Sequence, residues 1–178
     1  MLPQVQKKVY WEKQGQDKLC GVHCINSLLQ GPYFNEITLS EIALELDSTE
    51  KQLMAGQGFE SKDFLKFMEQ ESNNVADDGN YSFQVLAEAL RRKFNLEMES
   101  VDSKINRSED LSIENGFVCN SSSHWFGIRK IEGIWLNLNS TNRNGPEIVS
   151  DFYLRYDYRI KIFRINIYFN IIVHFYCP

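Results

Sequence analysis

The chain lacks an excess of positive charge, a long apolar run and a paired-cysteine motif, and each absence narrows its function. Its 178 residues include 24 Asp and Glu against 19 Lys and Arg, a net charge of -5. Nucleic acid is therefore not expected as its main partner, because phosphate binding requires a basic face. We expect no membrane span, because crossing a bilayer takes about 20 apolar residues. The first residues also lack the basic, apolar and small-residue series of a secretory signal.

Four cysteines occur without a CxxC pair, which argues against a structural zinc site. Cys20, His23 and Cys24 lie in one helical segment, but no second ligand cluster completes a site, and structural zinc usually takes four protein ligands. The absence of an export signal favours reduced thiols in an intracellular compartment. We therefore expect no metal and no cofactor.

The chain is long enough for one domain with its own core, and 43% of its residues are hydrophobic. The first half contains five candidate helix starts, each followed by apolar residues at helical spacing. These starts are Leu19, Thr38, Ser48, Ser61 and Ser82. Gly31 and Pro32 end the first helix. Thr38 and Glu41 have the spacing of a capping box, and Ser61 and Ser82 are polar caps.

The second half changes to the period of strands. Residues 96–101 roughly alternate, and residues 116–119, 125–131 and 134–138 are typical of three strands. Glu132 and Gly133 fit a tight hairpin turn between the last two. Because helices come first and strands later, the order predicts an α+β fold rather than a parallel βαβ fold.

The end of the chain has an unusual composition. Residues 155–178 are rich in Ile, Phe, Tyr, Asn and Arg, and polar residues interrupt their apolar run. We expect one final strand from this segment. We therefore divide the chain into a domain over residues 1–154 and a tail over residues 155–178, which we interpret as a replaced or aberrant C-terminus of the same domain.

Three residues stand in the chain order of a thiol-hydrolase site. Cys20 begins a helix, where the helix dipole favours a thiolate. His124 follows a polar run and begins a strand, and Asn139 follows at the end of residues 134–138. A thiol, an imidazole and a carboxamide form the Cys-His-Asn version of the catalytic triad. Spacing alone leaves Asn137 as an alternative to Asn139.

A thiol hydrolase also needs a hydrogen-bond donor for the negative oxygen of its tetrahedral intermediate. The main-chain N–H of Cys20 supplies one. Gln14 and Gln16 lie just upstream, and either side-chain amide is a candidate for a second.

Several ordered segments of the chain together resemble a Josephin domain of the ataxin type. The first is Glu12-Lys13-Gln14, and the second contains Cys20. The matching segments are residues 12–14, 19–31, 39–47, 83–90, 117–119, 124–126, 135–140 and 145–147, so the resemblance covers roughly residues 9–154. The family pattern has four residues between its Gln and its Cys, whereas five residues, 15–19, lie between Gln14 and Cys20 here.

The resemblance implies a papain-like α+β cysteine protease fold, with a helical N-terminal half and a helical arm, at about residues 38–70, packed on an antiparallel sheet. It implies a deubiquitinase that hydrolyses isopeptide bonds after the C-terminal glycine of ubiquitin. Cys20 is then the nucleophile, His124 the general base and acid, Asn139 the orienting residue and Gln14 the oxyanion donor.

Ubiquitin and ubiquitinated proteins are the implied partners, and we expect a monomer located in the nucleus, the cytoplasm or both. A non-catalytic ubiquitin-binding module with the same fold is the alternative. A thiol acyltransferase with the same triad is a further rival.

Overall fold

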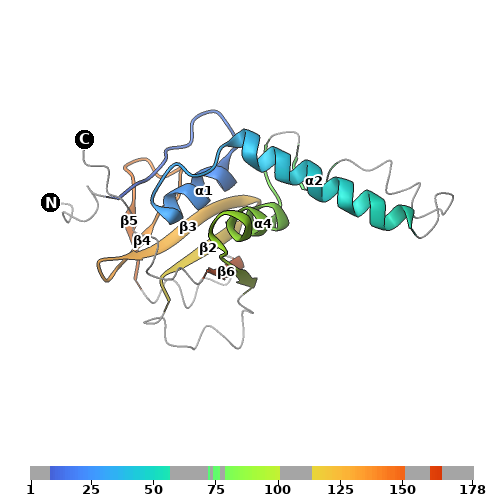
Figure 1. The fold of residues 1–178 in the computed structure, drawn as a ribbon. Coiled ribbons are helices and arrows are strands. Elements are labelled where there is room, and N and C mark those ends of the chain that lie inside the picture. The colour runs from blue at the N-terminus through green and yellow to red at the C-terminus, as the bar shows by residue number, and fades with distance from the viewer. Residues whose placement is uncertain are drawn as a thin grey trace.

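The computed structural model describes residues 9–56, 72, 74–76, 79–100, 114–150 and 161–165. Within these ranges the chain forms three helices and an antiparallel sheet in the strand order β1-β6-β2-β3-β4-β5, which confirms the predicted α+β class (Figure 1). The helices are α1 (Cys20–Leu29), α2 (Glu36–Ala55) and α4 (Phe83–Phe94). The strands are β1 (Met98–Ser100), β2 (Gly116–Ser121), β3 (His124–Ile131), β4 (Ile134–Asn137), β5 (Glu147–Ile148) and β6 (Lys161–Ile165).

Helices α1 and α4 begin and end where local signals predicted. Helix α1 starts at Cys20 and ends before Gln30, whose φ of 63° places it in the left-handed region ahead of Gly31. Ser82 caps α4, because its side chain accepts a hydrogen bond from the Val85 N–H. This bond satisfies one of the main-chain donors that every helix start leaves unpaired.

The start of α2 differs from the prediction. The helix begins at Glu36, and Asn35 is its cap: the Asn35 side chain accepts from the Thr38 N–H at 2.9 Å, and the Thr38 hydroxyl accepts from the Asn35 N–H at 3.1 Å. The capping box predicted at Thr38 and Glu41 is therefore wrong, because the actual box lies three residues earlier. Thr38 is the far partner of the box rather than its cap.

The predicted short helix starting at Ser48 is also wrong, because α2 continues through this point to Ala55. The neighbouring Thr49 hydroxyl donates to the Glu45 carbonyl at 2.9 Å, so it is satisfied inside the helix. The predicted start at Ser61 lies outside the described residues.

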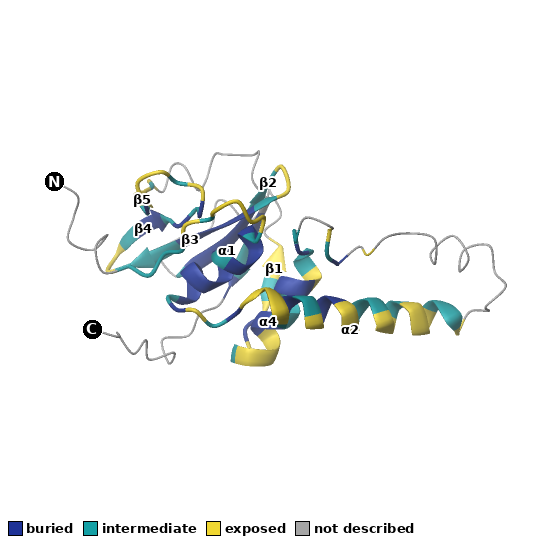
Figure 2. Cartoon of the chain, turned by 90° about the horizontal axis from the view of Figure 1, so that it is seen from above, coloured by how far each residue is buried: buried dark blue, intermediate teal, exposed yellow. Residues whose placement is uncertain are grey.

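Helix α2 projects away from the sheet as an arm, and much of its far half is exposed (Figures 1 and 2). Its base is held by Tyr81, whose hydroxyl donates to the Glu36 carbonyl at 3.0 Å and lies 2.9 Å from the Ser40 hydroxyl. No helix in the described part of the chain is long and apolar enough to cross a membrane.

The main core lies between the sheet and helices α1 and α4. Alternate residues of the central strands face it, such as Val118 of β2 and Trp125 of β3, while Phe117 and Phe126 join a second cluster on the opposite face. Helix α1 crosses close to β3 at Gly127, where a Cβ would lie 3.2 Å from the Leu28 side chain. The start of α1 lies beside the start of β3, where the Trp125 N–H donates to Cys20 Sγ.

The predicted strands are present in the sheet, including one from the tail. The hairpin turn between β3 and β4 is formed by Glu132 and Gly133, with φ of 49° and 79°, as the left-handed turn type requires. Strand β6 pairs with both β1 and β2, and its Ile165 is fully buried. The division of the chain into a domain over residues 1–154 and a tail over residues 155–178 stays a prediction. Strand β6, from the tail, belongs to the same sheet as the strands of the domain.

Candidate active site

The sulfur of Cys20 lies buried at the first turn of α1, between a donor and an acceptor. The Trp125 N–H donates to Sγ at 3.5 Å, and Sγ donates to Asn80 Oδ1 at 3.8 Å. Only 4% of Cys20 is exposed. The helix start and the Trp125 N–H both favour negative charge on this sulfur.

The ring of His124 lies beside the sulfur at the first residue of β3. It follows a two-residue turn of Ser122 and Ser123, and it stacks against Phe126 with ring centroids 6.4 Å apart. A hydrogen bond with Cys20 raises the pKa of His124 above its ordinary value; burial opposes this, and the hydrogen bond with Asn139 adds to it. The histidine is therefore a better proton acceptor than a free imidazole.

The Asn139 side chain holds the other edge of that ring. Its Oδ1 lies 2.8 Å from His124 Nε2 and also accepts from the N–H and hydroxyl of Thr141 at 3.0 and 2.9 Å. Because Oδ1 is an acceptor in all three contacts, Nε2 carries the proton. Nδ1 is then the ring nitrogen available to the sulfur.

The alternative, Asn137, has another task. Its Oδ1 accepts from the Asn139 N–H at 3.0 Å, so it supports the loop after β4 and does not contact the ring through that atom. The Trp11 indole N–H donates to the Asn139 carbonyl at 3.0 Å and holds the same loop from the N-terminal segment. The geometry thus brings Asn139, rather than Asn137, together with His124 and Cys20.

Gln14 lies beside the same loop. Its N–H donates to the Ser140 carbonyl at 3.0 Å, its Oε1 accepts from the Ser140 hydroxyl at 3.1 Å, and its Nε2 donates to the Asp17 carbonyl at 2.5 Å. The side-chain amide retains one further N–H for a ligand. Gln16 is exposed. Of the two candidates, Gln14 is the one fixed to the segment that carries Asn139.

His23 has a role that sequence reasoning missed. Its Nδ1 lies 2.6 Å from Glu12 and its Nε2 lies 3.0 Å from Asp17, so one imidazole clamps both ends of the loop ahead of Cys20. The hydrogen bond to Glu12 raises the pKa of His23, burial opposes the rise, and the bond to Asp17 adds to it. The sequence signal for this role was the presence of two acidic residues, Glu12 and Asp17, eleven and six residues before His23.

The thiol of Cys24, one turn after Cys20, is 1% exposed, and burial raises its pKa well above the ordinary value. It therefore stays protonated and unreactive. Within the described ranges, no group of three His, Cys, Asp or Glu side chains is placed to hold a metal ion.

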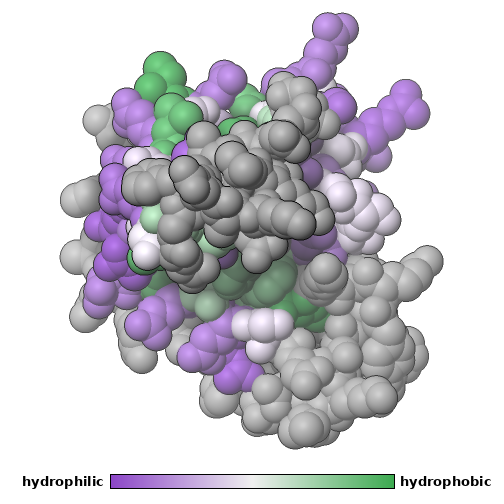
Figure 3. Space-filling model, turned by 90° about the vertical axis from the view of Figure 1, so that its right-hand side faces the viewer, coloured by the Kyte–Doolittle hydropathy of each residue, from purple (hydrophilic) through white to green (hydrophobic). Residues whose placement is uncertain are grey.

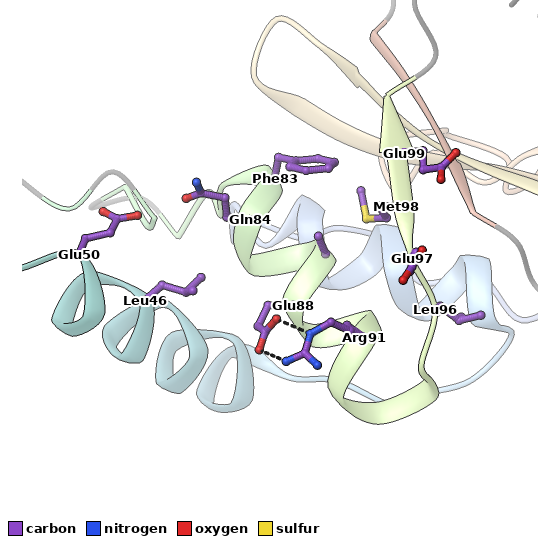
Figure 4. A pocket seen from close by; sticks show the side chains of 11 residues that line it. Leu46, Glu50, Phe83, Gln84, Glu88, Arg91, Leu96, Glu97, Met98 and Glu99 are labelled. Atoms are coloured by element: carbon purple, nitrogen blue, oxygen red, sulfur yellow. Dashed lines mark hydrogen bonds and ion pairs between the residues drawn. The ribbon is translucent and has the colours of Figure 1, made fainter. Parts of the chain in front are cut away.

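A groove of about 450 Å³ lies between α2, α4 and β1, and α4 lines it from Phe83 to Arg91. Its floor is apolar, with Phe83 and Met98, and its rim carries the ion pair between Glu88 and Arg91 (Figure 4). The side toward which α2 projects exposes apolar side chains among polar ones (Figure 3). The exposed large apolar residues of α2 are Ile37, Leu44 and Leu53.

Comparisons with known proteins show which family the chain belongs to. The Josephin family model matches residues 15–159. The chain belongs to the Josephin family. Its α+β architecture, with helices on one face of an antiparallel sheet, is the papain-like Josephin fold that the resemblance implied.

Relatives of this Josephin chain come from animals and plants. It is 41% identical to human Ataxin-3 over 151 residues, which are 83% of this chain and 41% of that protein. It is 42% identical to the human Ataxin-3-like protein over 147 residues, 80% of this chain and 40% of the relative. A putative ataxin-3 homolog of Oryza sativa subsp. japonica is 42% identical over 153 residues, 82% of this chain and 44% of its own length. The chain therefore spans about two fifths of these relatives.

Proposed function

We propose that this Josephin domain is a cysteine-type deubiquitinase that hydrolyses the isopeptide bond after the C-terminal glycine of ubiquitin. The observation that carries the proposal is the junction of three residues: the Trp125 N–H, next to His124, donates to Cys20 Sγ at 3.5 Å, and the His124 ring lies 2.8 Å from Asn139 Oδ1. Membership of the Josephin family supports the choice of ubiquitin as substrate.

The chemistry follows from this junction. His124 Nδ1 takes the proton of Cys20, and the thiolate is stabilised by the imidazolium and the Trp125 N–H. The sulfur attacks the glycine carbonyl, and the main-chain N–H of Cys20 and the remaining N–H of Gln14 bind the oxyanion. His124 then protonates the departing lysine amine.

The resulting thioester is cleaved by water, which His124 deprotonates as a general base. The proton returns to the thiol, so the cycle balances without any oxidant, metal or cofactor. Asn139 keeps Nε2 protonated throughout and so fixes Nδ1 as the atom that exchanges protons with the sulfur.

Replacing Cys20 tests the proposal. Cys20→Ala is expected to lower hydrolysis of a fluorogenic ubiquitin C-terminal reporter by at least about 10³-fold, because loss of a nucleophile removes the covalent path. Cys24→Ala is the matched control, since it removes a buried thiol one turn away and is expected to retain hydrolysis. Full activity in Cys20→Ala would contradict the assignment.

The competing possibility is a ubiquitin-binding module without turnover. In that case, the unchanged chain binds ubiquitin but leaves the reporter intact. Cys20→Ala then gives the same result as the unchanged chain in both the binding assay and the reporter assay. Ubiquitin and ubiquitinated proteins are the proposed partners, and location in the nucleus or cytoplasm stays a prediction.

A further inference from the structure

Asn80 contacts both halves of the candidate site, although nothing in the proposed mechanism uses it. It lies just before α4, and its Nδ2 donates to the Ser123 carbonyl at 2.9 Å. Its Oδ1 accepts from Cys20 Sγ at 3.8 Å. One carboxamide therefore joins the nucleophile to the residue that precedes His124.

The Ser123 carbonyl, in the turn before β3, fixes the orientation of the Asn80 carboxamide. A main-chain carbonyl only accepts hydrogen bonds, so the NH₂ group of Asn80 must face Ser123. The oxygen of the amide must then face the sulfur of Cys20. Turning the amide over would place two oxygens against each other and lose the 2.9 Å bond.

An oxygen acceptor and an N–H donor act on the sulfur in opposite directions. The Trp125 N–H, 3.5 Å away, stabilises the thiolate, whereas the Asn80 oxygen stabilises the thiol, because its lone pairs repel a negative sulfur. The S–H that points at Asn80 also does not point at His124. Asn80 thus opposes transfer of the Cys20 proton to His124.

The same carboxamide braces the turn that carries the histidine. Ser122 and Ser123 have φ of 50° and 63°, and the left-handed region is unfavourable for residues other than glycine. The hydrogen bond from Asn80 to Ser123 helps to hold this turn. The His124 ring keeps its own support from Asn139 at 2.8 Å.

We propose that Asn80 is a positioning residue of this site, which accepts a hydrogen bond from the S–H of Cys20 and links the thiol to the turn before His124. The role of Asn80 in turnover rests on the proposed function. The effect of Asn80 on the Cys20 thiol is independent of that function, because the reactivity of a cysteine toward a small alkylating agent requires no ubiquitin.

The test is the pH dependence of Cys20 alkylation by iodoacetamide in the full chain, followed by the mass of the peptide that contains Cys20. Asn80→Ala removes the acceptor, so the midpoint of the profile moves to lower pH. Alkylation on the acid side rises about two- to twelvefold, which is what loss of one hydrogen bond of ordinary strength produces.

Asn80→Asp has nearly the same shape and places a negative charge beside the sulfur, so the midpoint moves to higher pH and alkylation near neutral pH slows. This variant remains informative even when Asn80→Ala lowers the melting temperature. A purely structural disturbance would move both variants in the same direction. Shifts of equal sign, or unchanged profiles in both variants, would overturn the proposal.

A reporter assay run in parallel separates this proposal from the proposed function. If the unchanged chain fails to cleave the ubiquitin reporter while the two Asn80 variants still shift the alkylation profile in opposite directions, the deubiquitinase assignment is removed and the role of Asn80 is retained. The opposite shifts should also persist in a His124→Ala background. Their disappearance there would assign the effect to the turn and overturn direct contact with the sulfur.

Discussion

The clamp around His23 gives a stability prediction that can be worked out from the structure. His23→Gln removes the cation that holds Glu12 at 2.6 Å and Asp17 at 3.0 Å. The side chains of His23 and Glu12 are 16% and 19% exposed, whereas that of Asp17 is 37% exposed. The bond to Glu12 therefore dominates, since solvent weakens exposed pairs.

A hydrogen bond between charged groups contributes about 1.5–3 kcal/mol, and the Asp17 pair adds little. We expect His23→Gln to lower the free energy of unfolding by about 2–3 kcal/mol near pH 6. In a chain of this size that corresponds to a fall of about 4–12 °C in melting temperature. Thermal unfolding followed by circular dichroism measures it.

The pH dependence of this difference has a definite sign. The pKa of His23 is raised in the folded chain, so its contribution is complete below about pH 6.5 and is lost as pH rises through the folded value. The pKa of Glu12 is lowered, since the bonds from His23, Tyr10 and Asn26 outweigh burial, so its contribution needs a pH above about 4. The gap between the two proteins is therefore largest at about pH 5–6.5 and shrinks above it.

A matched control is Arg91→Gln, which breaks an ion pair of similar length, 2.7 Å, with Glu88. The Arg91 side chain is 58% exposed. We expect a much smaller change there. The reasoning is refuted when His23→Gln and the unchanged chain differ by the same amount at every pH, or when their difference grows toward high pH.

The remaining predictions concern catalysis and packing. Asn139→Ala is expected to lower kcat/KM about 10²-fold. Because the hydrogen bond with Asn139 raises the pKa of His124, the acid limb of the pH profile of kcat/KM moves to lower pH. An unmoved limb would contradict this. Gln14→Ala should lower kcat about 10²–10³-fold with little change in KM in steady-state assays. Gln16→Ala should match the unchanged chain. Equal losses of kcat in the two variants would show that Gln14 has no special role. Gly127→Val should cost about 1–3 kcal/mol in thermal unfolding, because α1 lies against this glycine; an unchanged melting temperature would contradict the close approach.

The helices that sequence could predict are those with one unambiguous local signal. Ser82 before α4 and Gly31 after α1 have no competing cap nearby. At α2, however, Asn35 with Thr38 and Thr38 with Glu41 both fit a capping box, and the pattern does not choose between them. Ser48 and Thr49 resemble a cap, but a threonine hydroxyl inside a helix can donate to the preceding turn instead.

Chain order singled out Cys20 and His124 but left Asn137 as an alternative to Asn139. The final strand could be expected from apolar composition. The groups that tune the sulfur could not be predicted, because they depend on contacts across the fold. Asn80 lies 60 residues from Cys20 in sequence, and the Trp125 N–H lies 105 residues away. The clamp on His23 depends on where the loop after Glu12 folds back, which periodicity does not report.

The most direct test of the central claim is the mass of the chain after reaction with ubiquitin that carries an electrophile in place of its C-terminal carboxylate. We predict one covalent adduct, located on Cys20 by peptide mapping and absent in Cys20→Ala. An unmodified chain that still binds ubiquitin, or an adduct on Cys24 instead, would contradict the claim that Cys20 is an activated nucleophile directed at ubiquitin.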